Sequence, residues 1–224
     1  VEVSAHTPSI SAVELKSMLD RGDNVQVLDS RPFDEYRRMT IPGSTNVPGA
    51  ELLHRFQSVV RDPTALVVVN CAGRTRSIIG AQSLINAQIE NKVVALRNGT
   101  MGWHLAGFAL EHGADRRAED VTIDQLRSAM NAAAEVANAA GVTTIGAAEY
   151  ARWLGERNKR TMYILDVRSP EEFALGHLFE ARCAPGGQLV QAAGRWIGIR
   201  NARVVLVDDT GVRAKMTAAW LLQM

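Results

Sequence analysis

The chain has 224 residues, 46% of them apolar, which is enough to build one large domain or two ordinary ones around a packed core. Its 25 lysines and arginines against 24 acidic residues give a net charge of +1 with no long basic tract, which argues against a nucleic-acid partner. No apolar run approaches the roughly 18 residues of a membrane helix, and two cysteines without a secretion signal favour reduced thiols. We therefore expect a cytoplasmic protein with no membrane partner.

The first helix and strands follow from local patterns. The segment 11–22 predicts a helix that starts at Ser11 and ends before Gly22. Three short β-branched runs, "NVQVLDS", "ALVVVN" and "KVVALR", are typical of strands buried in a parallel sheet. Because helical patterns separate them, the sequence predicts an α/β fold with a central, mainly parallel sheet flanked by helices.

An internal repeat divides the chain. The stretch "LDSRPFDEY" at 28–36 returns as "LDVRSPEEF" 137 residues later, and "NVPGAELL" at 46–53 returns as "CAPGGQLV" at the same offset. We expect a first domain at 1–115, a connecting helix at 116–142, where apolar residues recur at helical spacing, and a second, incomplete domain at 143–224.

The end of the run "ALVVVN" carries the candidate chemistry. Cys71 follows this strand directly and precedes a helix, a position where ligands bind in α/β sheets. The backbone N–H groups of residues 72–77 and the helix N-terminus favour thiolate over thiol, and Arg74 and Arg76 add positive charge that suits an anionic substrate. A cysteine that ends a strand can also be a buried, inert residue, but two adjacent arginines favour a functional role.

Four motifs in this order resemble the rhodanese superfamily of sulfurtransferases: "LDSRPFDEY", "IPGSTNVP", "CAGRTRS" and "LRNGTMGWHLAGF". The resemblance implies tandem rhodanese-like domains, and a cysteine that accepts a sulfane sulfur from an anionic donor such as thiosulfate and passes it to a thiol or cyanide as a persulfide. It implies Cys71 as the nucleophile, with a substrate-binding loop that comprises Ala72, Gly73, Arg74, Thr75, Arg76 and Ser77.

Other motif positions are expected to be structural. Asp29 and Arg31 match the D-x-R pair of the family, and we expect this pair to anchor neighbouring backbone. Thr40 stands where the family has a turn histidine, and Asn98 stands where glycine is common. His177 matches the turn histidine in the second copy and is also expected to be structural.

Two alternatives stay open. Cysteine phosphatases and arsenate reductases of the same superfamily use C-x5-R loops, whereas here position 77 is Ser and the arginine lies one place earlier, at Arg76, so sulfur transfer is favoured. The chain could also be a regulatory or sulfur-carrier binding module without turnover.

Five scattered histidines and two distant cysteines offer no metal-ligand spacing, and we expect no cofactor. A sulfur-acceptor protein is a further candidate partner.

The second copy lacks the thiol. Asp208 stands in the place of Cys71, and Cys183, which aligns with Asn46, lies outside the loop, so the second domain is expected to be inactive. The counterparts of residues 92–108 would fall at 229–245, past Met224. We therefore expect an open sheet edge at 202–207, covered by further rhodanese-like sequence of a longer chain or by another chain.

Overall fold

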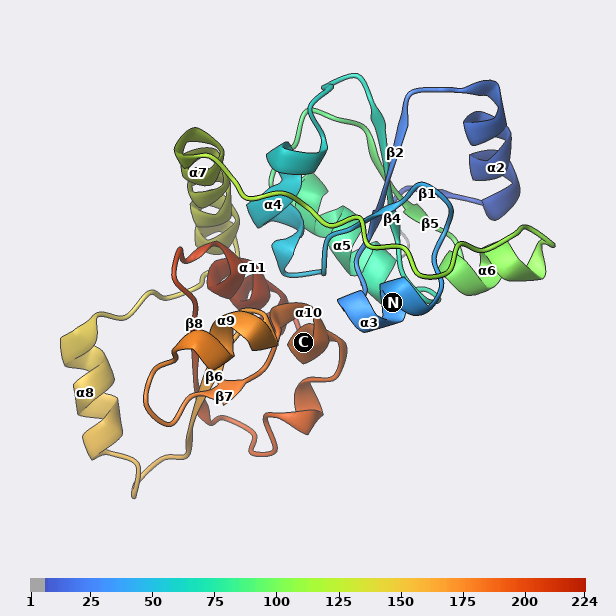
Figure 1. Ribbon diagram of the computed structural model, residues 1–224. Coiled ribbons are helices and arrows are strands. Elements are labelled where there is room, and N and C mark those ends of the chain that lie inside the picture. Colours follow the sequence, from blue (N-terminus) through green and yellow to red (C-terminus); the bar gives the residue numbers. More distant parts are fainter. Residues whose placement is uncertain (1–6) are drawn as a thin grey trace. The chain divides into compact units, whose positions relative to one another are not determined.

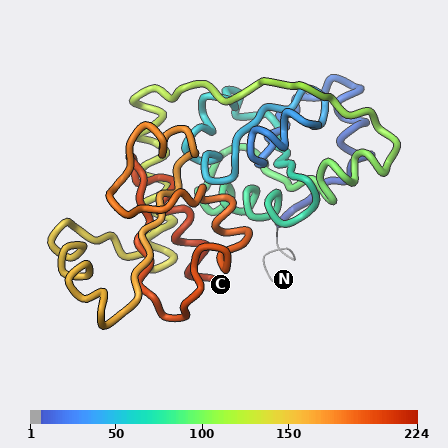
Figure 2. Tube along the Cα trace, turned by 60° about the horizontal axis from the view of Figure 1, so that its bottom comes forward, coloured from blue at the N-terminus to red at the C-terminus, as the bar shows by residue number. Residues whose placement is uncertain are grey.

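The computed structural model describes residues 7–224, and the chain forms two compact units that meet within one helix, between Ala129 and Met130. Figure 1 labels the elements of both units, and Figure 2 traces the chain through them. Each unit has a parallel β-sheet with helices packed against it. This agrees with the predicted α/β fold and with the division of the chain into two copies.

The sheet of the first unit has five parallel strands. The central strand β4 lies between β5 and β2, so its carboxyl end is surrounded by the ends of other strands. In the register of the sheet, Asp29 at the end of β2 pairs with Asn70 at the end of β4. In spatial order, the strands are β1 (Ser9–Ile10), β5 (Val93–Leu96), β4 (Leu66–Asn70), β2 (Val25–Asp29) and β3 (Thr45–Asn46).

Helices cover both faces of this sheet, as expected for parallel strands that are apolar on both sides (Figure 1). Val68 packs into a core with Leu15 and Trp103 on one face. Its neighbour Val69 points to the other face, where it lies next to Gly80. The helices are α2 (Ala12–Arg21), α3 (Phe33–Arg38), α4 (Glu51–Val59), α5 (Thr75–Asn86) and α6 (Gly99–Leu105).

The end residues predicted for the first helix are confirmed. Ser11 caps α2 by accepting a hydrogen bond from the Glu14 backbone, and the Glu14 side chain accepts one from the Ser11 backbone in return. Gly22 ends the helix with φ of 72°, a left-handed conformation that glycine adopts without strain.

The second unit repeats the middle of the first sheet. Its strands lie in the order β7 (Arg182–Cys183), β6 (Met162–Asp166), β8 (Arg203–Val207), which matches β3, β2, β4. Asp166 pairs with Val207 as Asp29 pairs with Asn70. Among the described residues β8 pairs with β6 alone, so its other edge carries no strand. The helices are α8 (Ala147–Gly155), α9 (Pro170–Leu175), α10 (Gly186–Gln191), the 3-10 turn η1 (Ala193–Arg195) and α11 (Val212–Leu221).

The helix α8 differs from its counterpart α2 in its packing. It has no buried residue, and it stands apart from the sheet of its unit (Figure 1). In the first unit, α2 packs against α6, and the described part of the second unit holds no counterpart of α6.

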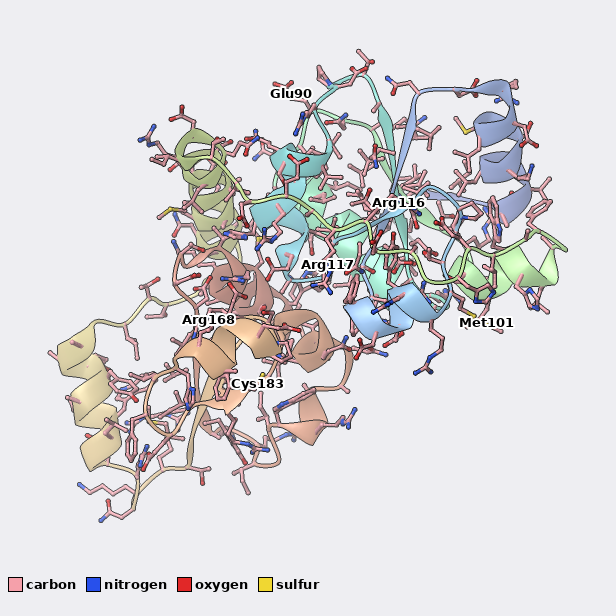
Figure 3. All side chains as sticks on the ribbon, in the orientation of Figure 1. Glu90, Met101, Arg116, Arg117, Arg168 and Cys183 are labelled. Atoms are coloured by element: carbon pink, nitrogen blue, oxygen red, sulfur yellow. The ribbon has the colours of Figure 1, made fainter. Side chains whose placement is uncertain are left out.

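The expected connecting helix is shorter than the segment 116–142. Helix α7 spans Ile123–Ala139, and Thr122 and Gln125 cap its start through reciprocal hydrogen bonds. The residues before it are extended because their backbone bonds the first unit: Asn46 N–H donates to the carbonyl of Arg116, and Ala118 N–H donates to the carbonyl of Asn46. Arg116 and Arg117 lie on this stretch (Figure 3). No helix in the described part of the chain is long and apolar enough to cross a membrane.

Candidate active site

Cys71 begins the loop that links the central strand β4 to helix α5. Its side chain is buried and 1% exposed. The backbone oxygens of Cys71 and Ala72 accept hydrogen bonds from the N–H groups of Thr100 (2.8 Å) and Met101 (3.0 Å) at the start of α6. Two helices therefore begin close to this cysteine: α5 starts at Thr75 further along the loop, and the first turn of α6 donates to the backbone of Cys71.

The approach of α6 to this loop depends on two left-handed residues. Asn98 has φ of 60° and Gly99 has φ of 53°. A Cβ atom on Gly99 would lie 2.2 Å from the carbonyl oxygen of Cys71, so this position admits glycine alone. Asn98, the departure from the glycine common in the family, is a residue that tolerates the left-handed region.

The backbone of the loop offers unused donors. The N–H groups of residues 72–77 have no acceptor among the described residues. Such a run of free donors at a helix N-terminus attracts an anion. Ser77, which was expected to bind substrate, is fully buried, and its hydroxyl donates to the carbonyl of Arg74 at 2.9 Å. Its side chain closes the turn.

The two arginines of the loop differ. The guanidinium of Arg76 donates to both carboxylate oxygens of Glu35 on α3, at 2.9 and 2.8 Å, and its side chain is 11% exposed. This pairing holds the pKa of Glu35 below its usual value. Arg76 also lies close enough to Cys71 for an electrostatic interaction between the two side chains. Arg74 is exposed and has no ion pair within residues 7–224, so it is the arginine of the loop that is accessible to a ligand.

The end of β2 carries a buried polar network. Arg31 donates three hydrogen bonds to the Asp29 carboxylate and one to the carbonyl of Met39, in keeping with the structural role expected of this pair. The same carboxylate accepts hydrogen bonds from Thr40 (2.8 Å) and Asn70 (2.8 Å). Thr40, which replaces the turn histidine of the family, is therefore part of this network.

The corresponding loop of the second unit already holds an anionic group. The carboxylate of Asp208 accepts hydrogen bonds from the backbone N–H groups of Gly211 (2.8 Å) and Arg213 (3.1 Å). These residues align with Arg74 and Arg76. Arg213 pairs with Glu172 as Arg76 pairs with Glu35, so the ion pair belongs to the framework of both loops.

Cys183 lies outside this loop, at the end of β7 (Figure 3). Burial raises the pKa of its thiol, and the carboxylates of Asp166 and Glu171 raise that pKa further. The thiol therefore stays protonated at neutral pH. His177 stacks on Phe173 and bonds the carbonyl of that residue, in keeping with the structural role expected of it. Within the described residues, no group of histidine, cysteine or acidic side chains is arranged to hold a metal ion.

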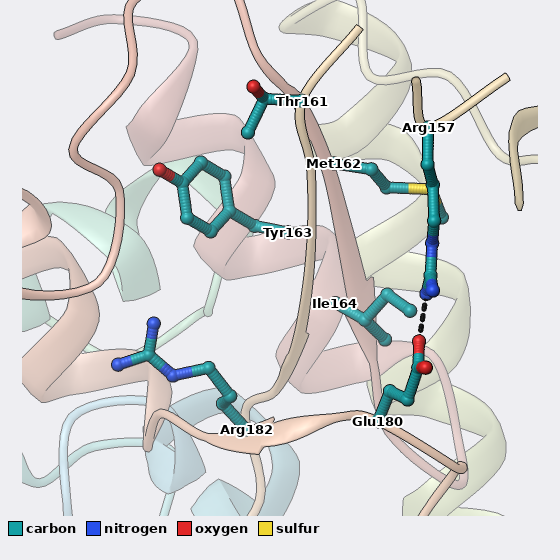
Figure 4. A pocket seen from close by; sticks show the side chains of 7 residues that line it. All are labelled: Arg157, Thr161, Met162, Tyr163, Ile164, Glu180 and Arg182. Carbon is teal, nitrogen blue, oxygen red and sulfur yellow. Dashed lines mark ion pairs between the residues drawn. The ribbon is translucent and has the colours of Figure 1, made fainter.

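An open pocket of the second unit also lies outside the loop. It runs along β6, and an ion pair between Arg157 and Glu180 lies on one side of it (Figure 4). Its lining comprises Arg157, Thr161, Met162, Tyr163, Ile164, Glu180 and Arg182, and includes no residue of the Asp208 loop.

Comparison with known proteins identifies the family. The model of the rhodanese-like domain matches residues 11–106 and 146–224, which together make up most of the chain. The chain belongs to the rhodanese-like domain family. Both copies of the internal repeat are thus rhodanese-like domains, as the motifs predict.

Two relatives are similar to the chain over different lengths. It is 53% identical to a thiosulfate sulfurtransferase from Pseudomonas aeruginosa, with a TM-score of 0.96 over 100% of this chain and 42% of that one. It is also 31% identical over 106 residues to an HTH-type transcriptional regulator from Mycobacterium tuberculosis. The matched segment covers 47% of this chain and 46% of the regulator. The chain therefore spans less than half the length of either relative.

Glu35 and Asn70 are site residues whose roles the sequence analysis does not predict. Glu35 had a signal in the sequence, because both it and Arg76 recur 137 residues later as Glu172 and Arg213. Asn70 had none, because its counterpart Val207 is apolar.

Proposed function

We propose that the first rhodanese-like domain is a sulfurtransferase that takes a sulfane sulfur from an anionic donor such as thiosulfate and carries it as a persulfide on Cys71. The observation that carries this proposal is the position of Cys71 at the start of a loop in which the N–H groups of residues 72–77 have no acceptor among the described residues. The similarity to the Pseudomonas thiosulfate sulfurtransferase over the full chain supports the choice of donor.

The Asp208 loop supports the anion-binding role assigned to the Cys71 loop. In the second unit, the N–H groups at 211 and 213 donate to a carboxylate that stands in the place of the thiol. The same donors in the first unit belong to Arg74 and Arg76. They are therefore suited to hold a thiolate, or a persulfide after transfer.

The reaction divides into two displacements. The Cys71 thiolate attacks the outer sulfur of thiosulfate, the Sγ–S bond forms, the S–S bond of the donor breaks, and sulfite leaves with the bonding electron pair. A thiolate or cyanide then attacks the outer sulfur of the persulfide, and Cys71 leaves as thiolate. Arg74, exposed beside the loop, would attract the anionic donor, whereas Arg76 is held by Glu35 and stabilises the loop.

The buried position of Cys71 favours small substrates. Only 1% of the surface of Cys71 is exposed. Thiosulfate and cyanide are small substrates of this kind. A protein acceptor would have to present its thiol on a projecting segment.

Steady-state kinetics test this function. Thiocyanate formation from thiosulfate and cyanide is expected to give parallel lines in double-reciprocal plots, because sulfite leaves before cyanide binds. Cys71→Ser should abolish the activity, and Cys183→Ser is the matched control that should retain it. If Cys71→Ser keeps the wild-type rate, the thiol is not the sulfur carrier. A wild-type protein with no turnover would favour a binding module, and hydrolysis of aryl phosphate by the same protein would favour a phosphatase.

A further inference from the structure

Asn70 is the last residue of β4 and immediately precedes Cys71. Its side chain is fully buried. The amide nitrogen donates to the Asp29 carboxylate at 2.8 Å and to the Thr100 hydroxyl at 3.0 Å. The backbone N–H of Thr100 in turn donates to the carbonyl of Cys71 at 2.8 Å. Asn70 and Cys71 are therefore both held by the same residue at the start of α6.

The orientation of this amide is fixed by its partners. The Asp29 carboxylate pairs with Arg31 and can only accept hydrogen bonds, so the amide must turn its nitrogen toward it. The amide oxygen of Asn70 is then left without a donor among the described residues. A buried acceptor without a donor is unfavourable and calls for an explanation. In this case the two hydrogen bonds from the nitrogen keep the side chain in place.

The second unit shows that the fold does not need this amide. Val207 takes the place of Asn70 at the end of β8, in the same register with Asp166. Asp166 still binds Arg168 as Asp29 binds Arg31. The copy that has lost the cysteine therefore keeps the strand, the register and the ion pair without the amide.

We propose that Asn70 is a positioning residue for Cys71. Through Asp29 it is tied to the end of β2, and through Thr100 it is tied to α6, so it fixes the backbone on which the Cys71 thiol and the loop donors are mounted. The purpose of this positioning depends on the sulfur transfer proposed above. The positioning acts on the reactivity of the thiol itself, so the first readout of its test needs no sulfur donor.

The test compares Asn70→Val, the residue of the second copy, with Asn91→Val. Asn91 is a matched control in the same unit, because it is also buried and donates from its amide nitrogen at 2.8 and 3.0 Å, to the carbonyls of Asp62 and Ala65. The first readout is the alkylation rate of Cys71 by iodoacetamide across pH, in a Cys183→Ser background. The second is kcat and KM for thiosulfate.

Asn70→Val is expected to slow alkylation at neutral pH about fivefold or more. It should lower kcat about tenfold and leave KM within about twofold. Asn91→Val should lose stability but keep both rates. Thr100→Val, which removes the second acceptor of the amide, should reproduce the Asn70→Val effects, and the double variant should show less than their sum.

A folded Asn70→Val that alkylates and turns over like Asn91→Val would overturn the proposal. If Asn70→Val does not fold, Thr100→Val decides in its place, and wild-type reactivity in that variant is again a refutation. A wild-type protein that takes up no sulfur, but whose alkylation still depends on Asn70, would contradict the proposed function and support the positioning role.

Discussion

Replacement of Gly99 by alanine should disrupt the cysteine loop far more than replacement of Gly43. Both glycines have positive φ, 53° and 78°, so alanine at either site pays for a left-handed backbone, about 1 kcal/mol. Nothing lies within 4 Å of a Cβ built on Gly43. A Cβ on Gly99 would lie 2.2 Å from the Cys71 carbonyl oxygen and 2.9 Å from the Gly73 nitrogen. Gly43→Ala is thus the control for the free-energy cost of a left-handed backbone at alanine.

The extra cost at Gly99 comes from movement of the loop. The Cys71 carbonyl has to shift by about 1 Å to reach an ordinary contact distance. This shift breaks the hydrogen bond that it accepts from Thr100, and it displaces the adjoining Ala72 carbonyl from Met101. Each such bond contributes about 1 kcal/mol, so Gly99→Ala should cost about 3 kcal/mol in total. Gly43→Ala should cost about 1 kcal/mol. A shift of this size at the nucleophile should also slow sulfur transfer about 100-fold.

Unfolding in urea is monitored by hydrogen exchange of peptides from β4. This measures the free energy of unfolding of the first unit separately from that of the second. Thiocyanate formation measures activity. Equal losses of stability and activity in Gly99→Ala and Gly43→Ala would refute the reasoning, because they would show that the α6 approach does not constrain the loop.

Three further predictions concern ionisable groups. Arg74→Ala should raise the KM for thiosulfate severalfold with little loss of stability, whereas Arg76→Ala should lower stability because it leaves Glu35 unpaired; equal kinetic and stability effects would contradict this division of roles. The pKa of Glu35 lies below its usual value of 4.5, so its pairing stabilises the fold above that pH and is lost as the pH falls through the lowered pKa. Acid titration of unfolding should show a steeper loss for the wild type than for Glu35→Gln. Burial raises the pKa of Cys183, so peptide mapping after alkylation at neutral pH should find Cys71 modified first, and preferential modification of Cys183 would contradict the assignment.

The fold could be predicted well from the sequence because its signals are local and occur twice. The strands β2, β4 and β5 are short apolar runs within the predicted segments, and the bounds of α2 follow from Ser11 and Gly22. The start of α7 is less predictable. Residues 116–118 bond the backbone of Asn46, a tertiary contact that the helical pattern does not contain.

Only those parts of the site that lie on one contiguous segment of the chain could be predicted from the sequence. Cys71 and the N–H groups of its loop lie on one contiguous stretch, so a motif describes them. The partner of Arg76 comes from another helix, and the partners of Asn70 come from another strand and from α6. Long-range pairs of this kind have no fixed spacing in the sequence. The recurrence of Glu35 and Arg76 in the second copy does not by itself show that they are in contact, so Arg76 was expected to face the substrate.

The most direct test of the sulfurtransferase account is the intact mass of the protein after incubation with thiosulfate and removal of excess reagent. The account predicts a gain of one sulfur atom per chain, about 32 Da, which maps to Cys71 and disappears on treatment with dithiothreitol. The same protein with Cys71→Ser should gain nothing, and Cys183→Ser should gain as much as the wild type. An unchanged mass in the wild type, or a gain that persists in Cys71→Ser, would contradict the claim that Cys71 carries sulfur.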